Sequence, residues 1–205
     1  MKILIVTGGS SSERKISLIS ARAAKQALES NGHSVSLFDF KNGYDELKKA
    51  LAQFDIVFPI MHGKDGEDGT LYKFLRSSKT PFVGCSPRGA KIAFDKILLK
   101  QYCKRKSIPT AAWKIVRNAN DVSKFGFPCV LKGSYGGSSH EVAILHSNKD
   151  LLRPRVKKIL NLEKNRFFVE KLLLGTEVTI GILLDNALPV LEIIPQEGAW
   201  FDYKS

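Results

Sequence analysis

The chain has 205 residues, 43% of them hydrophobic and 25% charged, which is the composition of a globular protein long enough for one large or two small domains. It contains no apolar run of membrane-spanning length. Its three cysteines, Cys85, Cys103 and Cys129, do not have the spacing of a metal site. Their odd number and wide spacing favour a reducing, cytoplasmic compartment. The net charge is +12, but the basic residues are spread along the chain, so a small phosphate-bearing ligand is favoured over nucleic acid.

The first part of the chain alternates short apolar strands with helical segments. Helices are expected after the loop Gly8–Ser12, at Tyr44–Leu51 and at Gly69–Ser77, and strands at Lys2–Val6, His33–Phe38, Asp55–Met61 and Pro81–Gly84. This alternation implies right-handed βαβ units and a parallel sheet. Ligands of such sheets sit beyond the carboxyl ends of the strands, where the loops Gly8–Ser12 and His62–Gly69 lie.

From Ser86 onward the pattern changes to clustered strands with segregated helices. Helices are predicted at Pro87–Ala93, Lys96–Lys106 and Asn148–Leu160, and strands at Ala111–Val116, Cys129–Leu131, Val142–Leu145, Phe167–Val169, Glu177–Leu184 and Leu188–Ile194. Such an order favours an α+β unit with an antiparallel sheet.

Two loops of the first part carry candidate binding residues. Glu13 follows a run of small residues and either grips an ammonium group or simply favours a first helical turn, with the two roles about equally supported. His62 is either a ligand-facing donor or a turn residue, and Glu67 or Asp68 is a candidate cap for the next helix. The glycine spacing of a dinucleotide-binding fingerprint is absent.

Further candidates suit a nucleotide. Lys132 ends a short apolar strand that runs into the loop Gly136–Ser139, where glycines allow close approach of backbone N–H groups to an anion. Lys96 opens a helix, where a lysine is disfavoured by the helix dipole unless it reaches a bound anion. Glu170, Lys171 and Glu177 could meet an adenine edge and a ribose diol, or could form a polar connection with weak surface ion pairs.

Taken in chain order, these segments resemble the D-alanine–D-alanine ligases of the ATP-grasp superfamily. The matching motifs are Gly8–Arg14 with Ile16–Leu18, His62–Leu71, Phe94–Lys96, Phe127–Pro128, Leu131–Lys132, Gly137–Ser139, Val169–Lys171 with Gly175 and Glu177, Leu188–Pro189, Glu192–Pro195 and Phe201–Tyr203. The block His62–Leu71 is the most specific of them, and the match covers nearly the whole chain.

The resemblance implies an α/β fold of three parts. These are an N-terminal parallel-sheet domain of the pre-ATP-grasp, Rossmann-like kind over residues 1–85, a central ATP-grasp domain over 86–171, and the start of a C-terminal ATP-grasp domain over 172–205. It also implies the reaction. ATP phosphorylates the carboxylate of one D-alanine, and the amine of a second D-alanine attacks the acyl phosphate, giving D-alanyl-D-alanine for peptidoglycan synthesis.

The resemblance also assigns roles to residues. Glu13 and Ser138 would be catalytic, and Glu13 and His62 would bind the first D-alanine. The phosphates of ATP would meet Lys96, Lys132 and the loop residues Gly136, Gly137, Ser138 and Ser139. Glu170 and Lys171 would meet adenine, and Glu177 the ribose. The required magnesium ligands are expected beyond Ser205, so the chain is expected to be an inactive fragment.

Some features depart from the family pattern or stay open. The phosphate loop continues with His140-Glu141, where a small apolar residue and glycine are usual, and a carboxylate there would repel phosphate unless it turns away. Alternatives are a ligase with another acceptor, such as D-lactate or D-serine, and a non-catalytic nucleotide-binding module. The resemblance further suggests a cytoplasmic homodimer that acts on small molecules, without nucleic-acid or membrane partners.

Overall fold

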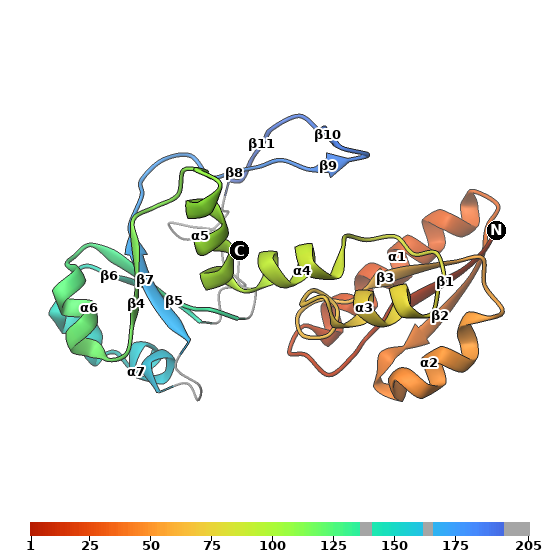
Figure 1. The fold of residues 1–205 in the computed structure, drawn as a ribbon, viewed down its shortest axis with the longest axis horizontal. Coiled ribbons are helices and arrows are strands. Elements are labelled where there is room, and N and C mark those ends of the chain that lie inside the picture. Colours follow the sequence, from red (N-terminus) through yellow and green to blue (C-terminus); the bar gives the residue numbers. More distant parts are fainter. Residues whose placement is uncertain (136–140, 162–165, 195–205) are drawn as a thin grey trace. The chain divides into compact units, whose positions relative to one another are not determined.

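The computed structural model describes residues 1–135, 141–161 and 166–194. The chain divides into two compact units, Met1–Lys106 and Ser107–Ser205, whose elements are labelled in Figure 1.

A three-stranded parallel sheet forms the centre of the first unit. Its strands lie in the order β2-β1-β3, with β1 at Lys2–Thr7, β2 at Ser34–Asp39 and β3 at Ile56–Ile60. The helices between and after them are α1 (Arg14–Ser30), α2 (Gly43–Leu51) and α3 (Thr70–Ser77), with a short 3-10 helix, η1, at Phe40–Asn42. The predicted parallel sheet is thus confirmed.

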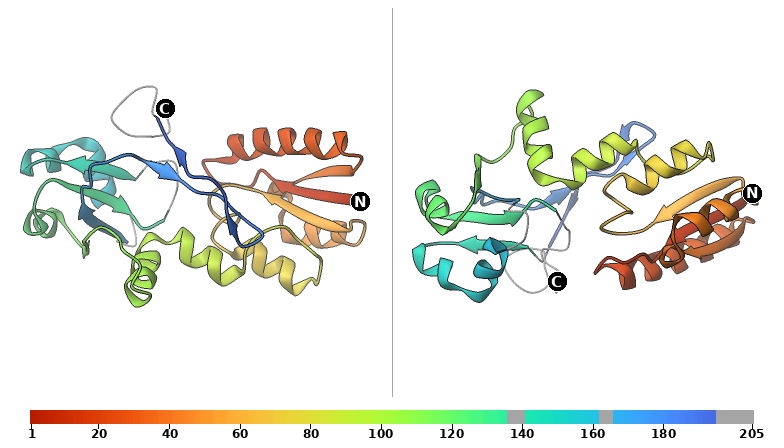
Figure 2. Two further views of the ribbon diagram at one scale, coloured as in Figure 1. Left: turned by 90° about the horizontal axis from the view of Figure 1, so that it is seen from above. Right: turned by 60° about the horizontal axis from the view of Figure 1, so that its bottom comes forward.

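Alternate side chains of β1 enter two separate cores. Ile3 and Ile5 pack with Ala21 of α1 on one face of the sheet. Leu4 and Val6 face the other way, into a cluster with the buried leucines of α2 and α3, which are Leu47, Leu51, Leu71 and Leu75. The sheet therefore has α1 on one side and α2 on the other (Figure 2), and β1 is buried on both faces, as its continuous apolar run predicts.

The predicted fourth strand of this unit is reduced to one bridge. Phe82 pairs with Val57 of β3 in parallel, with Val57 N–H donating to the carbonyl of Pro81 at 2.9 Å. Proline lacks an N–H and so cannot extend a ladder by donating to it. The strand predicted at Pro81–Gly84 is therefore a local contact rather than a full strand.

Two helices close the first unit, α4 (Pro87–Phe94) and α5 (Lys96–Arg105). Each begins at a side-chain cap. Ser86 Oγ accepts from Gly89 N–H at 3.0 Å, and Asp95 Oδ1 accepts from the N–H groups of Ile97 and Leu98 at 3.1 and 3.2 Å. These helices group with the parallel-sheet unit, whereas the domain boundary predicted at 85/86 would separate them from it; that division stays a proposal.

The second unit is built on a four-stranded antiparallel sheet in the order β4-β7-β5-β6. Its strands are β4 (Trp113–Val116), β5 (Cys129–Gly133), β6 (Val142–Leu145) and β7 (Phe167–Lys171), and its helices are α6 (Ala119–Phe125) and α7 (Pro154–Leu160), with a 3-10 helix, η2, at Asn148–Leu152. Val122, Val156 and Ile159 of the helices pack on one face of this sheet. The predicted α+β arrangement is confirmed.

After β7 the chain forms two small antiparallel ribbons. The strand pairs are β11 (Leu191–Glu192) with β8 (Val178–Thr179) and β10 (Asn186–Ala187) with β9 (Ile182–Leu183). Leu184 and Asp185 turn the second pair, both with positive φ, which is the geometry of a type I′ hairpin turn. The two strands predicted at Glu177–Leu184 and Leu188–Ile194 are therefore much shorter in the structure.

Candidate functional site

The candidate site of the first unit begins at the carboxyl end of β1. Gly8 and Gly9 both have left-handed φ values, 81° and 79°, and carry the chain from β1 into α1. Glu13 is the residue before the helix and is 8% exposed. Its side chain does not cap α1, so the alternative that Glu13 serves the first helical turn is less well supported than a role toward a ligand.

The loop after β3 supplies His62. Its Nδ1 lies 3.3 Å from Oε1 of Glu67, and Gly63 N–H donates to Oε2 of the same carboxylate at 2.8 Å. Asp68, rather than Glu67, serves the next helix, because its Oδ1 accepts from Thr70 N–H at 2.9 Å. Glu67 therefore orients the His62 loop and its imidazole.

The structure brings Glu13 and this loop together. A Cβ atom placed on Gly63 would lie 2.9 Å from Oε2 of Glu13, so the carboxylate rests directly on the Gly63 backbone beside His62. The carboxyl ends of β1 and β3 are neighbours in a parallel sheet, which explains why residues far apart in sequence meet here. A buried carboxylate beside an imidazole and glycine backbone suits the ammonium group of a small amino acid.

An ion pair that sequence reasoning missed supports the first loop. The two terminal guanidinium nitrogens of Arg14, Nη1 and Nη2, donate to the Asp39 carboxylate at 2.7 and 2.5 Å, and Nη1 also donates to the Gly9 carbonyl at 3.1 Å. The hydrogen bond from Arg14 lowers the pKa of Asp39 from 3.8 to about 2. Asp39 ends β2 opposite Thr7 of β1, so the pair fastens the glycine turn to the sheet edge.

Lys96 is the first residue of α5, directly after the buried cap Asp95. The macrodipole of α5 favours an anion at this end. This position is compatible with the phosphate role that the resemblance assigns to Lys96.

In the second unit, two predicted ATP residues contact each other. Lys132 Nζ on β5 lies 2.5 Å from Glu170 Oε1 on β7, and Glu170 is only 8% exposed. The neighbouring Lys171 is exposed, and its N–H donates to the Ala112 carbonyl at 2.9 Å. Any adenine contact from Lys171 must therefore use its carbonyl or its side chain.

The remaining predicted residues are less constrained or undescribed. Glu177 is exposed, and its carbonyl accepts from Ile193 N–H at 2.8 Å. Gly136, Gly137, Ser138 and Ser139 lie outside the described residues. Glu141 is described: a Cβ atom on Gly133 would lie 2.0 Å from its Oε2, so its carboxylate is folded onto the Gly133 backbone.

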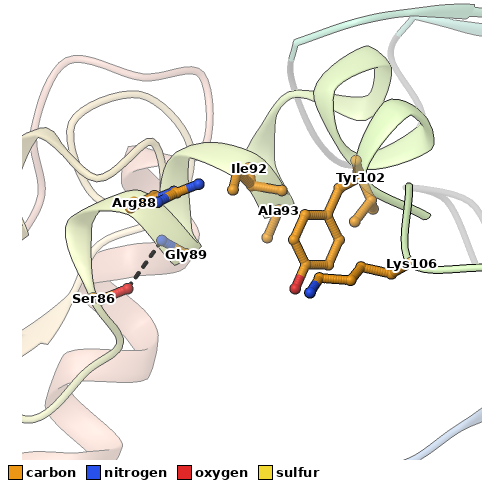
Figure 3. A pocket seen from close by; sticks show the side chains of 8 residues that line it. Ser86, Arg88, Gly89, Ile92, Ala93, Tyr102 and Lys106 are labelled. Carbon is orange, nitrogen blue, oxygen red and sulfur yellow. Dashed lines mark hydrogen bonds between the residues drawn. The ribbon is translucent and has the colours of Figure 1, made fainter. Parts of the chain in front are cut away.

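A separate cavity of about 550 Å³ lies between α4 and α5. It is lined by Ser86, Arg88, Gly89, Ile92, Ala93, Leu99, Tyr102 and Lys106 (Figure 3). Among the residues that the structure describes, none of the predicted site residues lines it, so this cavity is distinct from the Glu13–His62 pair.

Within residues 1–135, 141–161 and 166–194, there is no group of three or more His, Cys, Asp or Glu placed to hold a metal ion. In the same ranges, no helix combines the length and apolar character that crossing a bilayer requires.

The fold places the chain in the ATP-grasp class of proteins. That class combines a parallel-sheet unit with a following antiparallel α+β unit in which one strand carries a lysine. Two family models match, one described as D-ala D-ala ligase N-terminus over residues 40–85 and one as D-ala D-ala ligase C-terminus over residues 102–205. The chain belongs to the D-alanine–D-alanine ligase family, whose members are ATP-dependent ligases.

Individual relatives agree with this assignment. The chain is 37% identical over 208 residues to the D-alanine–D-alanine ligase of Nitratidesulfovibrio vulgaris (strain DP4) and 32% identical over 216 residues to that of Synechococcus sp. (strain JA-3-3Ab). All of this chain aligns in both cases, against 68% and 65% of the relatives, so it spans about two thirds of their length.

Solved structures of the family give the same result. The D-alanine–D-alanine ligase of Bacillus anthracis matches all of this chain and 67% of its own, with a TM-score of 0.84 and 28% identity. Its complex with ATP matches 94% of this chain and 66% of its own, with a TM-score of 0.79 and 27% identity. The predicted ATP-grasp fold is therefore confirmed.

Proposed function

We propose that this chain provides the D-alanine site and part of the ATP site of an enzyme that joins two D-alanines. The observation that carries the proposal is the Glu13 carboxylate, buried against Gly63 beside His62, in a member of this family. The relative from Bacillus anthracis has been solved with ATP, which supports ATP as the phosphoryl donor here.

The chemistry begins with binding of the first D-alanine. Glu13 accepts hydrogen bonds from its ammonium group, and His62, oriented by Glu67, lies beside it. A carboxylate oxygen of that D-alanine attacks the γ-phosphorus of ATP, and ADP leaves. The amine of the second D-alanine then attacks the acyl carbon, the phosphate leaves and the nitrogen loses a proton. Positioning and charge stabilisation account for most of the catalysis in such steps.

The ATP contacts are carried over from the resemblance. Lys132 and Lys96 meet phosphates, with Gly136, Gly137, Ser138 and Ser139 as the phosphate loop and Ser138 also in the catalytic network. Glu170 and Lys171 meet adenine, and Glu177 meets ribose. The ion pair between Lys132 and Glu170 supports a shared nucleotide site for these two residues. It holds the Lys132 ammonium group, proposed to meet phosphate, next to Glu170, proposed to meet adenine.

Magnesium neutralises phosphate charge in phosphoryl transfer when it is bound. The described residues include no cluster that fits it, so we derive no step through the ion. The homodimer, the cytoplasmic location and the absence of nucleic-acid and membrane partners also stay proposals. The other acceptors and the non-catalytic module stay alternatives.

The D-alanine role is tested by titrating the ¹⁵N-labelled chain with D-alanine and following the amide of Gly63. We expect saturable shifts at Gly63 and His62, lost in Glu13→Gln. The exposed Glu29 on α1, the helix that follows Glu13, gives the control Glu29→Gln, which should bind as the wild type does. Binding that is unaffected by Glu13→Gln would remove the site from this position.

The ATP role is tested with Lys132→Met, which keeps the apolar stem and removes the charge. We expect ATP affinity, measured by calorimetry, to fall at least about tenfold, since a charge-assisted contact to phosphate is lost. The exposed Lys114 on β4, a strand of the same sheet, gives the matched control Lys114→Met. Equal affinities for the wild type and Lys132→Met would contradict the assignment.

A further inference from the structure

Two serine hydroxyls link the backbone of Glu13 to the backbone of His62 in both directions. Glu13 N–H donates to Ser11 Oγ at 3.2 Å, and that hydroxyl donates to the His62 carbonyl at 2.7 Å. In the reverse direction, His62 N–H donates to Ser17 Oγ at 2.9 Å, and that hydroxyl donates to the Glu13 carbonyl at 3.2 Å. We call Ser11 and Ser17 the serine bridge.

Each hydroxyl accepts one hydrogen bond and donates one, so both groups are used as relays. A serine in the first turns of a helix often bonds only to a carbonyl four residues earlier. Ser17 makes that bond to Glu13 and also receives the N–H of a loop 45 residues away. The bridge is thus a tertiary connection and not merely a local feature of α1.

Burial makes the connection rigid. Ser17 is completely buried and Glu13 is 8% exposed, while Ser11 is half-buried. Hydrogen bonds shielded from water are stronger, and a buried N–H that loses its acceptor pays the full cost of desolvation. Water cannot easily replace Ser17 as the partner of His62 N–H.

The side chains of the proposed site meet at the bridge. A Cβ atom on Gly63 would lie 2.9 Å from Glu13 Oε2 and 3.0 Å from Ser11 Cβ, so the carboxylate, the serine and the histidine loop are in contact. Glu67 holds the other side of this loop through Gly63 N–H and His62 Nδ1. The bridge therefore joins the two backbone segments from which the Glu13 carboxylate and the His62 imidazole extend.

We propose that Ser11 and Ser17 are positioning residues for the amino-acid site, acting through the backbones of Glu13 and His62. This inference rests on the proposed function, because it takes the Glu13–His62 pair as the place where D-alanine binds. A displacement of about 1 Å is enough to cost a hundredfold in a reaction that depends on orientation. The bridge prevents such a displacement between two loops that no strand pairing joins directly at these residues.

The test compares Ser17→Ala and Ser11→Ala with two control variants from the same region, Ser12→Ala at an exposed position and Ser20→Ala on α1. Two quantities are measured on the 205-residue chain by NMR: the amide hydrogen exchange of His62, and the dissociation constant for D-alanine. For Ser17→Ala we expect His62 exchange to quicken at least about tenfold and D-alanine to bind about tenfold more weakly. The controls should stay within about twofold.

Rescue separates a positioning role from a purely structural one. Ser17→Thr keeps the hydroxyl, so it should restore both the slow exchange of His62 and much of the D-alanine affinity. The midpoint of thermal unfolding is recorded for every variant, and affinity should follow the hydroxyl and not this midpoint. If Ser17→Ala does not fold, Ser11→Ala and Ser17→Thr are compared instead.

Failure of the inference and failure of the proposed function are read from different samples. If the wild-type chain does not bind D-alanine at Glu13, the proposed function is wrong at this site. In that case the His62 amide exchange rates of the wild type and Ser17→Ala still test whether the serine bridge forms. Two results would overturn the serine bridge. One is an unchanged rate of His62 amide exchange in Ser17→Ala. The other is an unchanged D-alanine affinity in both Ser11→Ala and Ser17→Ala when the wild type binds D-alanine.

Discussion

Lys132 and Glu170 form an ion pair across two adjacent strands, with Nζ 2.5 Å from Oε1. In the register of β5 and β7, Glu170 lies opposite Val130, two residues from Lys132, so the two side chains project from the same face of the sheet. Glu170 is 8% exposed and Lys132 is half-buried. Because both charges are partly removed from water, each depends on the other for compensation.

The first prediction follows from this dependence. Lys132→Met should lower the free energy of unfolding by about 1–3 kcal/mol, because the buried Glu170 carboxylate loses its ion pair with the Lys132 ammonium group. Adding Glu170→Gln should recover part of that loss, since the buried negative charge that Lys132 had balanced is then gone. Urea unfolding of the two single variants and the double variant measures the coupling. Losses that simply add in the double variant would contradict it.

The second prediction concerns Asp39 and acid. Arg14 lowers the pKa of this carboxyl group to about 2, so the folded state favours the ionised form. The resulting stabilisation is present above pH 4 and is lost as pH falls toward 2, because Asp39 then protonates in both states. Solvent screening of this partly exposed pair limits the contribution to about 1 kcal/mol at pH 7.

Asp39→Asn checks this directly. At pH 7 the variant should be less stable than the wild type by about that amount, and the two unfolding free energies should converge between pH 4 and pH 2. The exposed Asp45 on α2 offers the control Asp45→Asn. A stability difference that stays constant down to pH 2 would show that Asp39 acts through packing and not through its charge.

The third prediction orders the cysteines by reactivity. Cys129 is completely buried on β5, and burial raises the pKa of its thiol to about 11, whereas Cys85 is exposed. Since the thiolate is the reactive form, iodoacetamide at pH 8 should modify Cys85 at least about tenfold faster than Cys129. Mass spectrometry of digested samples measures both rates, and in urea the two should become similar. Equal rates in native buffer would mean that β5 opens readily.

The fold could be read from the sequence where burial is continuous. Ile3–Val6 of β1 is apolar on both faces, and the neighbouring strands β2 and β3 alternate with helices, so the parallel sheet was predictable. The segment Asn148–Leu160 was predicted as one helix, but it forms η2 and α7. Pro154 is the first residue of α7, because proline lacks an N–H and its ring clashes with the preceding turn anywhere deeper in a helix.

Two other elements could not be foreseen. The short helix α6 contains one buried residue, Val122, and its start depends on Asn118 accepting from Asp121 N–H at 3.0 Å. The ribbon turn at Leu184 and Asp185 has positive φ at both residues without a glycine, and Asp185 alone is a weak turn signal. In both cases the sequence signal is local and weak, and tertiary context decides.

Some residues of the candidate site could likewise be predicted from the sequence, and others could not. Glu13 and His62 could be proposed because glycine-rich loops follow strands that end at one edge of a parallel sheet. Ser11, Ser17, Arg14 and Asp39 received no role from the sequence, although all four hold these loops in place. Their partners lie tens of residues away, and serine or arginine near a helix start is too common to indicate such contacts.

The last prediction compares two glycines with nearly the same backbone. Gly8 and Gly32 have φ values of 81° and 78°, so alanine at either position pays about 1 kcal/mol for the left-handed conformation. Their surroundings differ. A Cβ atom on Gly8 would lie 2.4 Å from Asp39 Oδ1 and 2.6 Å from Arg14 Nη1, whereas within the described residues a Cβ atom on Gly32 meets nothing closer than 4 Å.

Gly8→Ala should therefore cost about 1–3 kcal/mol more than Gly32→Ala, because the added methyl group pushes apart the ion pair that holds the turn. The excess should shrink when Gly8→Ala is combined with Asp39→Ala, which removes the clashing carboxylate, and Gly32→Ala should show no such coupling. Thermal and urea unfolding of these variants measure the effect. Equal costs at the two glycines would mean that the turn after β1 yields easily, and the contact between the glycine turn and the Arg14–Asp39 pair would then contribute little to the rigidity of the amino-acid site.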